Sequence, residues 1–154
     1  MANLQLRVQT DMTWKHDGKP ITTPPCGSYG FIYLITYTDG TRYVGKKDFY
    51  SYQTLPALKS GIQRPDSERI GKNRNGKRVY FDKVKKESKW QSYTGSSKLT
   101  KGKKILTKEI IDIAPTKRNL TYLEVKYLFH FNALEDSSYM NDNILGKFYK
   151  DNLI

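Results

Sequence analysis

Hydrophobic residues are concentrated in a few short segments of this chain, and polar residues fill the long stretches between them. In the densest apolar run, residues 31–37, almost every position is apolar or aromatic, with little alternation. Such a run is typical of a strand that is covered on both faces. Asp39-Gly40 and a second strand-like run follow it. The pattern therefore predicts a β-hairpin formed by residues 30–38 and 41–47.

The remaining apolar segments predict one more strand and several helices. β-branched residues followed by Pro115 predict a third strand over 105–114, and residues 120–135 have the clearest helical pattern. Shorter helices are expected over 50–60, 79–89 and 146–152. The predicted fold class is α+β, with a three-stranded antiparallel β-sheet flanked by helices.

The chain is expected to divide into an arm and one domain. Residues 1–28 hold several Pro and Gly and predict an N-terminal arm with little regular structure beyond a short strand. Residues 29–154 are expected to form a single domain, a size that suits one hydrophobic core. Within it, residues 61–78 are polar and rich in Gly, Asn and Arg, and we expect them to form a mobile basic insertion.

Charge adds a preference for polyanionic partners. The formal net charge is +12, and residues 59–108 hold sixteen Lys or Arg but only four Asp or Glu, so this third carries the whole excess. A local positive field of this kind favours nucleic acid as the partner. The alternative interpretation is a solvated basic surface that only confers solubility.

Cysteine content and hydropathy exclude other classes. The single cysteine, Cys26, excludes an internal disulfide and a cysteine-based zinc site. There is no run of eighteen apolar residues, and the first residues lack the pattern of a signal peptide. We therefore expect a cytoplasmic protein that makes no membrane contact.

Two tyrosines lie just inside the ends of the predicted hairpin, and the strand register decides whether they meet. A two-residue Asp39-Gly40 turn would place Tyr33 and Tyr43 on opposite faces. A three-residue loop that starts at Thr38 would place both phenols on one face as diagonal neighbours. The sequence allows either register, and both tyrosines could also be ordinary strand residues.

Two polar residues near the C-terminus are further candidates. Glu124 lies on the apolar stripe of its predicted helix, where a carboxylate needs a partner or a metal ion. It also matches a capping box with Thr121, and this alternative stays open. Asn141 is either a turn residue or an amide that orients a phosphate group or a water molecule.

The ordered set of Phe31-Ile32-Tyr33, Tyr43-Val44-Gly45, Glu124 and Asn141 resembles the motifs of the GIY-YIG nuclease superfamily, especially its small phage-encoded members. The first motif departs from the family pattern because Phe replaces its initial Gly. The family also has an arginine soon after the second motif, but residues 46–60 contain none. We predict that Lys46 replaces it; the other candidates are Lys47, Lys59, Arg64, Arg69, Arg74 and Arg78.

This resemblance implies a DNA endonuclease that uses Mg²⁺ or Mn²⁺. Tyr33 would be the general base, and Tyr43 would position the water molecule or the phosphate. Glu124 would hold a single metal ion, Lys46 would contact the phosphate, and Asn141 would complete the catalytic set. The residues expected to contact DNA are Gly45, Lys47, Lys72, Arg74, Lys77 and Arg78.

Several alternatives remain open. The missing arginine favours a second function, a non-catalytic nucleic-acid-binding module on the same fold, and a small basic protein that binds another protein is a third. Cleavage of both DNA strands would call for a homo-oligomer or for rebinding, because one active site cuts one strand. A phage-encoded protein would act in the cytoplasm of the host cell.

Overall fold

The computed structural model describes residues 12–153, so residues 1–11 of the predicted arm lie outside the described part of the chain. The chain forms two compact units, one from residues up to Lys47 together with those from Gln91 onward, and one from Asp48–Trp90. Within residues 12–153, no helix is long and apolar enough to cross a membrane.

The first unit contains a five-stranded sheet in the order β2-β1-β8-β3-β4. Its strands are β1 (Lys15–His16), β2 (Lys19–Pro20), β3 (Gly30–Tyr37), β4 (Arg42–Asp48) and β8 (Ile105–Ala114). The three predicted strands are confirmed, and β3 pairs antiparallel with β8. The predicted three-stranded sheet is nevertheless wrong, because the short β1–β2 hairpin of the arm adds two strands and β1 runs parallel to β8.

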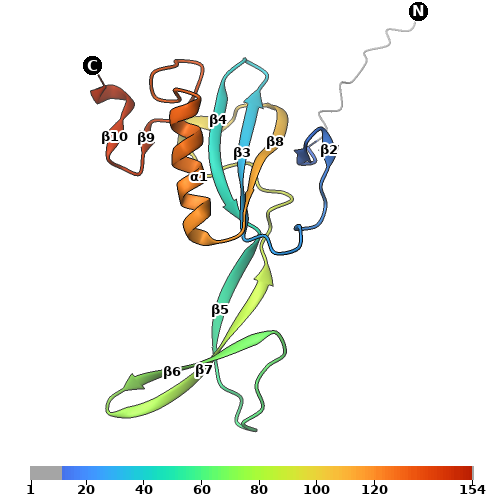
Figure 1. Ribbon diagram of the computed structural model, residues 1–154, viewed down its shortest axis with the longest axis vertical. Helices are drawn as coiled ribbons and strands as arrows, with labels where there is room; N and C mark the ends of the chain where they lie inside the picture. The colour runs from blue at the N-terminus through green and yellow to red at the C-terminus, as the bar shows by residue number, and fades with distance from the viewer. Residues whose placement is uncertain (1–11, 154) are drawn as a thin grey trace, which may run out of the picture. The chain divides into compact units, whose positions relative to one another are not determined.

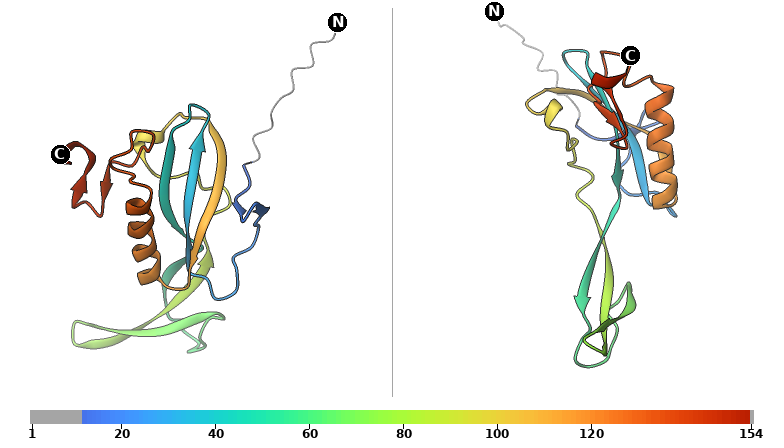
Figure 2. Two further views of the ribbon diagram at one scale, coloured as in Figure 1. Left: turned by 45° about the horizontal axis from the view of Figure 1, so that its top comes forward. Right: turned by 90° about the vertical axis from the view of Figure 1, so that its left-hand side faces the viewer.

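The sheet of the first unit is covered on both faces, as the apolar run of β3 predicts. On one face, Ile32 and Val44 pack with Leu120 and Leu128 of the helix α1 (Lys117–His130). On the other face, the Trp14 ring lies 5.2 Å from the Phe31 ring, centroid to centroid. The right-hand view of Figure 2 shows α1 on one side of this sheet and the yellow segment around Lys98–Thr100 on the other.

The helix α1 begins three residues earlier than the predicted start. Its N-cap is Thr116, whose hydroxyl oxygen accepts a hydrogen bond from the backbone N–H of Asn119 at 3.1 Å. Thr121 therefore lies one turn inside the helix, where its hydroxyl donates to the Lys117 carbonyl at 3.3 Å. The capping-box interpretation of Glu124 is wrong, because the helix is capped elsewhere.

The C-terminal segment is extended instead of helical. The helix predicted over 146–152 is wrong: β9 (Asn143–Ile144) pairs with β10 (Phe148–Tyr149), and a 3₁₀ turn, Lys150–Asn152, follows. Gly146 lies in the connection between these strands with φ of 63°, a left-handed conformation that favours glycine.

The second unit is a three-stranded antiparallel sheet in the order β5-β7-β6, drawn in green in Figure 1. Its strands are β5 (Tyr50–Pro56), β6 (Ser67–Arg74) and β7 (Lys77–Glu87). The helices predicted over 50–60 and 79–89 are therefore wrong. The basic insertion predicted over 61–78 lacks regular structure only up to residue 66, and β6 and the start of β7 form the rest of it. Asn75 and Gly76 join β6 to β7 with φ of 50° and 73°, values that suit a two-residue type I′ hairpin turn.

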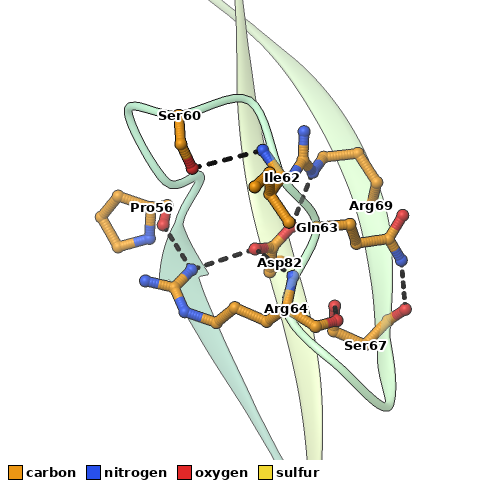
Figure 3. A network of polar contacts seen from close by, with 8 residues as sticks. All are labelled: Pro56, Ser60, Ile62, Gln63, Arg64, Ser67, Arg69 and Asp82. Carbon is orange, nitrogen blue, oxygen red and sulfur yellow. Dashed lines mark hydrogen bonds and ion pairs between the residues drawn. The ribbon is translucent and has the colours of Figure 1, made fainter.

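A fully buried carboxylate, Asp82, holds the base of this second sheet together (Figure 3). Arg69 Nε donates to one carboxylate oxygen at 2.6 Å, and Arg64 Nη1 donates to the other at 3.0 Å. Arg64 Nη1 also donates to the Pro56 carbonyl at 2.6 Å. Burial acts to raise the pKa of Asp82, but the hydrogen bonds from Arg69 and Arg64 outweigh it and lower that pKa. The network ties the connection between β5 and β6 to β7.

We expect Asp82→Asn to loosen the second unit, because two guanidinium groups would lose their carboxylate. Amide hydrogen exchange should speed up over β6 and β7, while exchange in α1 stays unchanged. Since the pKa of Asp82 is lowered, its stabilisation is present at neutral pH and is lost as the pH falls through that lowered pKa.

Asp66→Asn is the matched control for this experiment, because Asp66 is exposed in the same β5–β6 connection. Equal exchange rates for the two variants would contradict a structural role for the Asp82 network.

Candidate active site

The register of the β3–β4 hairpin brings the two motif tyrosines together. Tyr37 N donates to the Thr41 carbonyl at 2.8 Å, and Gly40 N donates to the Tyr37 carbonyl at 3.0 Å. Gly40 has φ of 84°, so the connection is the three-residue loop of the two alternatives. The ring centroids of Tyr33 and Tyr43 are 6.3 Å apart. The register with both phenols on one face is therefore confirmed.

Gly45 makes room for the Tyr33 ring. A Cβ atom at Gly45 would lie 2.4 Å from the Tyr33 hydroxyl oxygen and 2.5 Å from its Cζ atom. The Tyr33 side chain is buried, and the Tyr93 ring approaches it edge-on at a centroid distance of 5.9 Å. Gly45 is also predicted to contact DNA, and the space that a side chain would take at this glycine is occupied by the phenol of Tyr33.

Four of the five predicted catalytic residues line one pocket of about 310 Å³ beside β4 and α1. These residues are Tyr43, Lys46, Glu124 and Asn141. Tyr33 packs against Tyr43 but is not among the lining residues. The pocket also includes Asp142 and Asn143, which follow Asn141 in the chain.

The inward-facing carboxylate of Glu124 has a cationic partner from β4. Lys46 Nζ lies 2.8 Å from Glu124 Oε2, and both side chains are partly exposed. The same ammonium group donates to the Thr121 hydroxyl oxygen at 3.2 Å. The residue predicted to replace the family's arginine thus lies directly against the residue predicted to hold the metal ion.

The Asn141 side chain is hydrogen-bonded to the backbone of β4. Its Oδ1 atom accepts from Val44 N at 3.0 Å, and its Nδ2 atom donates to the Val44 carbonyl at 2.7 Å. The side chain is buried, so it completes the hydrogen bonding of this edge strand as a neighbouring strand would. Asn141 therefore fixes the backbone between Tyr43 and Gly45, and these two hydrogen bonds commit both ends of its amide.

Both motif phenols are held in their neutral form. Burial raises the pKa of Tyr43 to about 12, and the nearby charge of Glu124 adds to this effect. Burial raises the pKa of Tyr33 further still, with contributions from Tyr93 and Tyr43. In the free protein at neutral pH, both tyrosines therefore carry an O–H group.

A divalent cation fits the chemistry of this pocket. Within residues 12–153 there is no cluster of three or more His, Cys, Asp or Glu side chains that could hold a metal ion alone. The pocket does contain two carboxylates, Glu124 and Asp142. Mg²⁺ is often bound by one or two carboxylates, with water molecules and substrate phosphates completing its shell.

Some residues near the site are not predicted from the sequence. Tyr93 contacts Tyr33 edge-on, and Lys47 Nζ lies 4.8 Å from the centroid of the Tyr93 ring. Lys117 and Arg118 line an adjoining hollow that shares Val125 and Leu145 with the pocket. The first turn of α1, with both cations, was outside the helix predicted from residue 120. An earlier N-cap at Thr116 is the signal that would have found them.

The predicted DNA contacts are divided between the two units. Gly45 and Lys47 belong to β4 in the first unit, whereas Lys72, Arg74, Lys77 and Arg78 lie at the end of the β6–β7 hairpin in the second. Arg64 and Arg69, two other candidates for the missing arginine, are bound to Asp82.

Comparison with known proteins gives a match to a family model. The family model described as "Putative endonuclease segE, GIY-YIG domain" matches residues 14–149. Searches of curated proteins and of solved structures give no match. The matched range includes the arm hairpin, both tyrosine motifs, α1 and the second unit.

We predict that Gly45→Ala lowers the free energy of unfolding by about 1–3 kcal/mol, because the new methyl group would overlap the buried Tyr33 ring. Urea denaturation of the single and double variants measures this effect. In a Tyr33→Ala background the same change should cost much less, since the ring is gone. Equal costs in both backgrounds would show that the contact does not limit position 45.

Proposed function

The chain belongs to the SegE GIY-YIG endonuclease-domain family, and from this premise we propose that it is a metal-dependent DNA endonuclease that hydrolyses phosphodiester bonds. The observation that carries the proposal is the single pocket that joins Tyr43, Lys46 and Glu124, with Tyr33 packed behind Tyr43. These residues come from the β3–β4 hairpin and from α1, two parts of the chain that are far apart in the sequence. Their arrangement suits a reaction that activates a water molecule and neutralises a phosphate.

Glu124 would hold one Mg²⁺ or Mn²⁺ ion, and Asp142 is the second carboxylate available to it. When bound, the ion would supply positive charge to the phosphate and to the leaving oxygen. Lys46 neutralises Glu124 in the free protein. With a cation on Glu124, the Lys46 ammonium group would be free to turn toward a phosphate oxygen. The free-energy cost of this turn would be small, because the lysine side chain is flexible.

Two tyrosines are candidates for the general base. The family resemblance assigns this role to Tyr33, whose phenol is buried and has the more strongly raised pKa. The pocket favours Tyr43 as a second candidate, because Tyr43 lines it and has a pKa of about 12. Either phenol would need the positive charge of Lys46 or of a bound cation to lose its proton near neutral pH.

DNA is the proposed partner because the second unit, residues 48–90, holds eleven Lys or Arg against five Asp or Glu. Lys72, Arg74, Lys77 and Arg78 are all exposed there, so they can contribute phosphate contacts. We further propose that this affinity is largely independent of the pocket, since the ribbon and the pocket belong to different compact units. One pocket cuts one strand, so double-strand cleavage would require two copies or a second binding event.

A cleavage assay on supercoiled plasmid tests the proposal. We expect nicking with Mg²⁺ and none with EDTA, and we expect Glu124→Gln and Lys46→Met each to lower the rate by about 10²-fold or more. Glu135→Gln is the matched control, because Glu135 is an exposed acid outside the pocket.

A wild-type protein that binds DNA but never nicks plasmid, branched or single-stranded substrates would overturn the catalytic proposal. The chain would then be the binding module that the missing arginine favours. Activity that persists in EDTA would remove the metal ion from the proposal.

The pH dependence of nicking assigns the general base. A phenol with a pKa well above neutral becomes a phenolate tenfold more often with each pH unit, so kcat/KM should rise about tenfold per unit from pH 6 to 9. The Phe variant of the true base should lose both rate and slope. If Tyr33→Phe keeps the slope and Tyr43→Phe loses it, the pocket-lining phenol is the base; if both variants keep it, neither is.

A further inference from the structure

The end of the β6–β7 hairpin is a two-stranded ribbon with two chemically different faces. Arg74 pairs with Lys77 across the Asn75-Gly76 turn, and each earlier residue of β6 pairs with the next residue of β7. Cross-strand partners share a face, and faces alternate along each strand. One face, the Asn73 face, carries Gly71, Asn73, Arg78 and Tyr80. The other, the Lys72 face, carries Lys72, Arg74, Lys77 and Val79.

The cations of this ribbon are available for a ligand. Residues 71–80 contain four Lys or Arg and no acid, and all four cations are exposed. Among the described residues, none of the four forms an ion pair, whereas Arg64 and Arg69 at the base of the sheet are both bound to Asp82. The ten residues around the turn of the ribbon thus carry a net charge of +4, and Lys83, Lys85 and Lys86 add further cations along β7.

Arg78 lies over Gly71, a diagonal neighbour on the paired strand that has no side chain. A Cβ atom at Gly71 would lie 2.7 Å from Arg78 Nε, so in this conformation the arginine occupies space that a side chain at position 71 would take. Its guanidinium carbon is 5.9 Å from the centroid of the Tyr80 ring. Asn73 is the direct cross-strand partner of Arg78. An arginine and an asparagine are therefore presented side by side on one exposed face.

This pairing matches the chemistry of base edges in duplex DNA. The major groove of B-DNA is wide enough to admit a two-stranded β-ribbon. Arginine forms a bidentate contact with guanine there, and asparagine forms one with adenine. Lysine and arginine contacts to phosphates, by contrast, hold DNA without reading its sequence.

We infer that the β6–β7 ribbon reads DNA sequence in the major groove through Asn73 and Arg78, while the cations of the Lys72 face contact phosphates. The inference rests on DNA being the substrate, as proposed above, and adds a sequence preference to it. It differs from a purely electrostatic role, in which all four cations of the ribbon are equivalent.

Binding selection from a random duplex library, performed in EDTA, tests this inference without cleavage. The wild-type protein should enrich sites with at least one preferred G·C and one preferred A·T pair. Arg78→Lys keeps the charge but loses the planar guanidinium group that can make two hydrogen bonds to guanine. It should therefore reduce discrimination between G·C and other base pairs at that position by roughly 5- to 150-fold. Asn73→Ala should do the same at the A·T position.

The Lys72 face provides the matched controls. Arg74→Lys is the same chemical change on the other face, and we expect it to leave the enriched sequence unchanged. Lys77→Gln should weaken binding to all sequences alike and reduce the salt slope of binding by about one. Arg78→Lys should leave that slope unchanged.

Gly71→Ala tests the placement of Arg78 without changing any charge. The added methyl group would displace the arginine, so the G·C preference should fall as it does in Arg78→Lys. Unchanged amide exchange over β6 and β7 would show that the sheet remains folded in this variant.

A library that stays random after selection by the wild-type protein would overturn the inference, and so would equal effects of Arg74→Lys and Arg78→Lys. These results are distinct from a failure of the proposed function. Nicking of plasmid without base preference would leave the nuclease proposal standing, and a clear preference without nicking would leave the ribbon inference standing. Absence of any DNA binding would overturn the inference and the proposed substrate together.

Discussion

The close packing of the Tyr33 ring over Gly45 is the constraint on which the candidate site depends. This contact requires the strand register that a three-residue loop sets, because a shift by one residue would turn Tyr33 and Tyr43 to opposite faces. It also requires a glycine on β4, since even a methyl group would overlap the phenol. The second motif therefore has a packing reason for its glycine that is independent of any substrate. The two motifs therefore meet in one packing contact, between Tyr33 on β3 and Gly45 on β4.

Charge is arranged differently in the two units. In the first, Lys46 and Glu124 neutralise each other inside a partly exposed pocket, so neither charge is left uncompensated before a substrate arrives. In the second, a buried carboxylate binds two arginines at the base of the sheet and leaves the distal cations exposed. The buried Asp82 thus stabilises the fold of the second unit, and the exposed cations give its surface a positive field that favours polyanions.

The sequence predicts the first unit far better than the second. The strand β3 has a dense apolar run because both faces of its sheet are buried there. The strand β4 follows it after Asp39-Gly40, and the β-branched residues of β8 stop at Pro115. The strands β5 and β7 are exposed over most of their length, so no apolar face marks their period, and the positions at Val79, Phe81 and Val84 fit a short helix equally well. The Asn75-Gly76 pair is a strong hairpin signal that the basic composition around it obscures.

Site residues follow the same division between local and long-range information. The tyrosine motifs, Glu124 and Asn141 can be found from their order along the chain, but their partners cannot. Glu124 has a capping-box pattern that only the position of Thr116 excludes, and its pairing with Lys46 joins residues that are 78 positions apart.

Asn141 illustrates what residue identity alone leaves undetermined. An asparagine near a phosphate-handling pocket suggests an amide that touches the substrate, yet both ends of this amide are hydrogen-bonded to the Val44 backbone. An amide side chain has one donor end and one acceptor end, so it can replace a strand partner for a single residue. The two hydrogen bonds to Val44 fix the backbone between Tyr43 and Gly45, the two residues of β4 that contact Tyr33. Asn141 thus affects the pocket through β4, because its hydrogen bonds to Val44 hold the neighbouring Tyr43 in position.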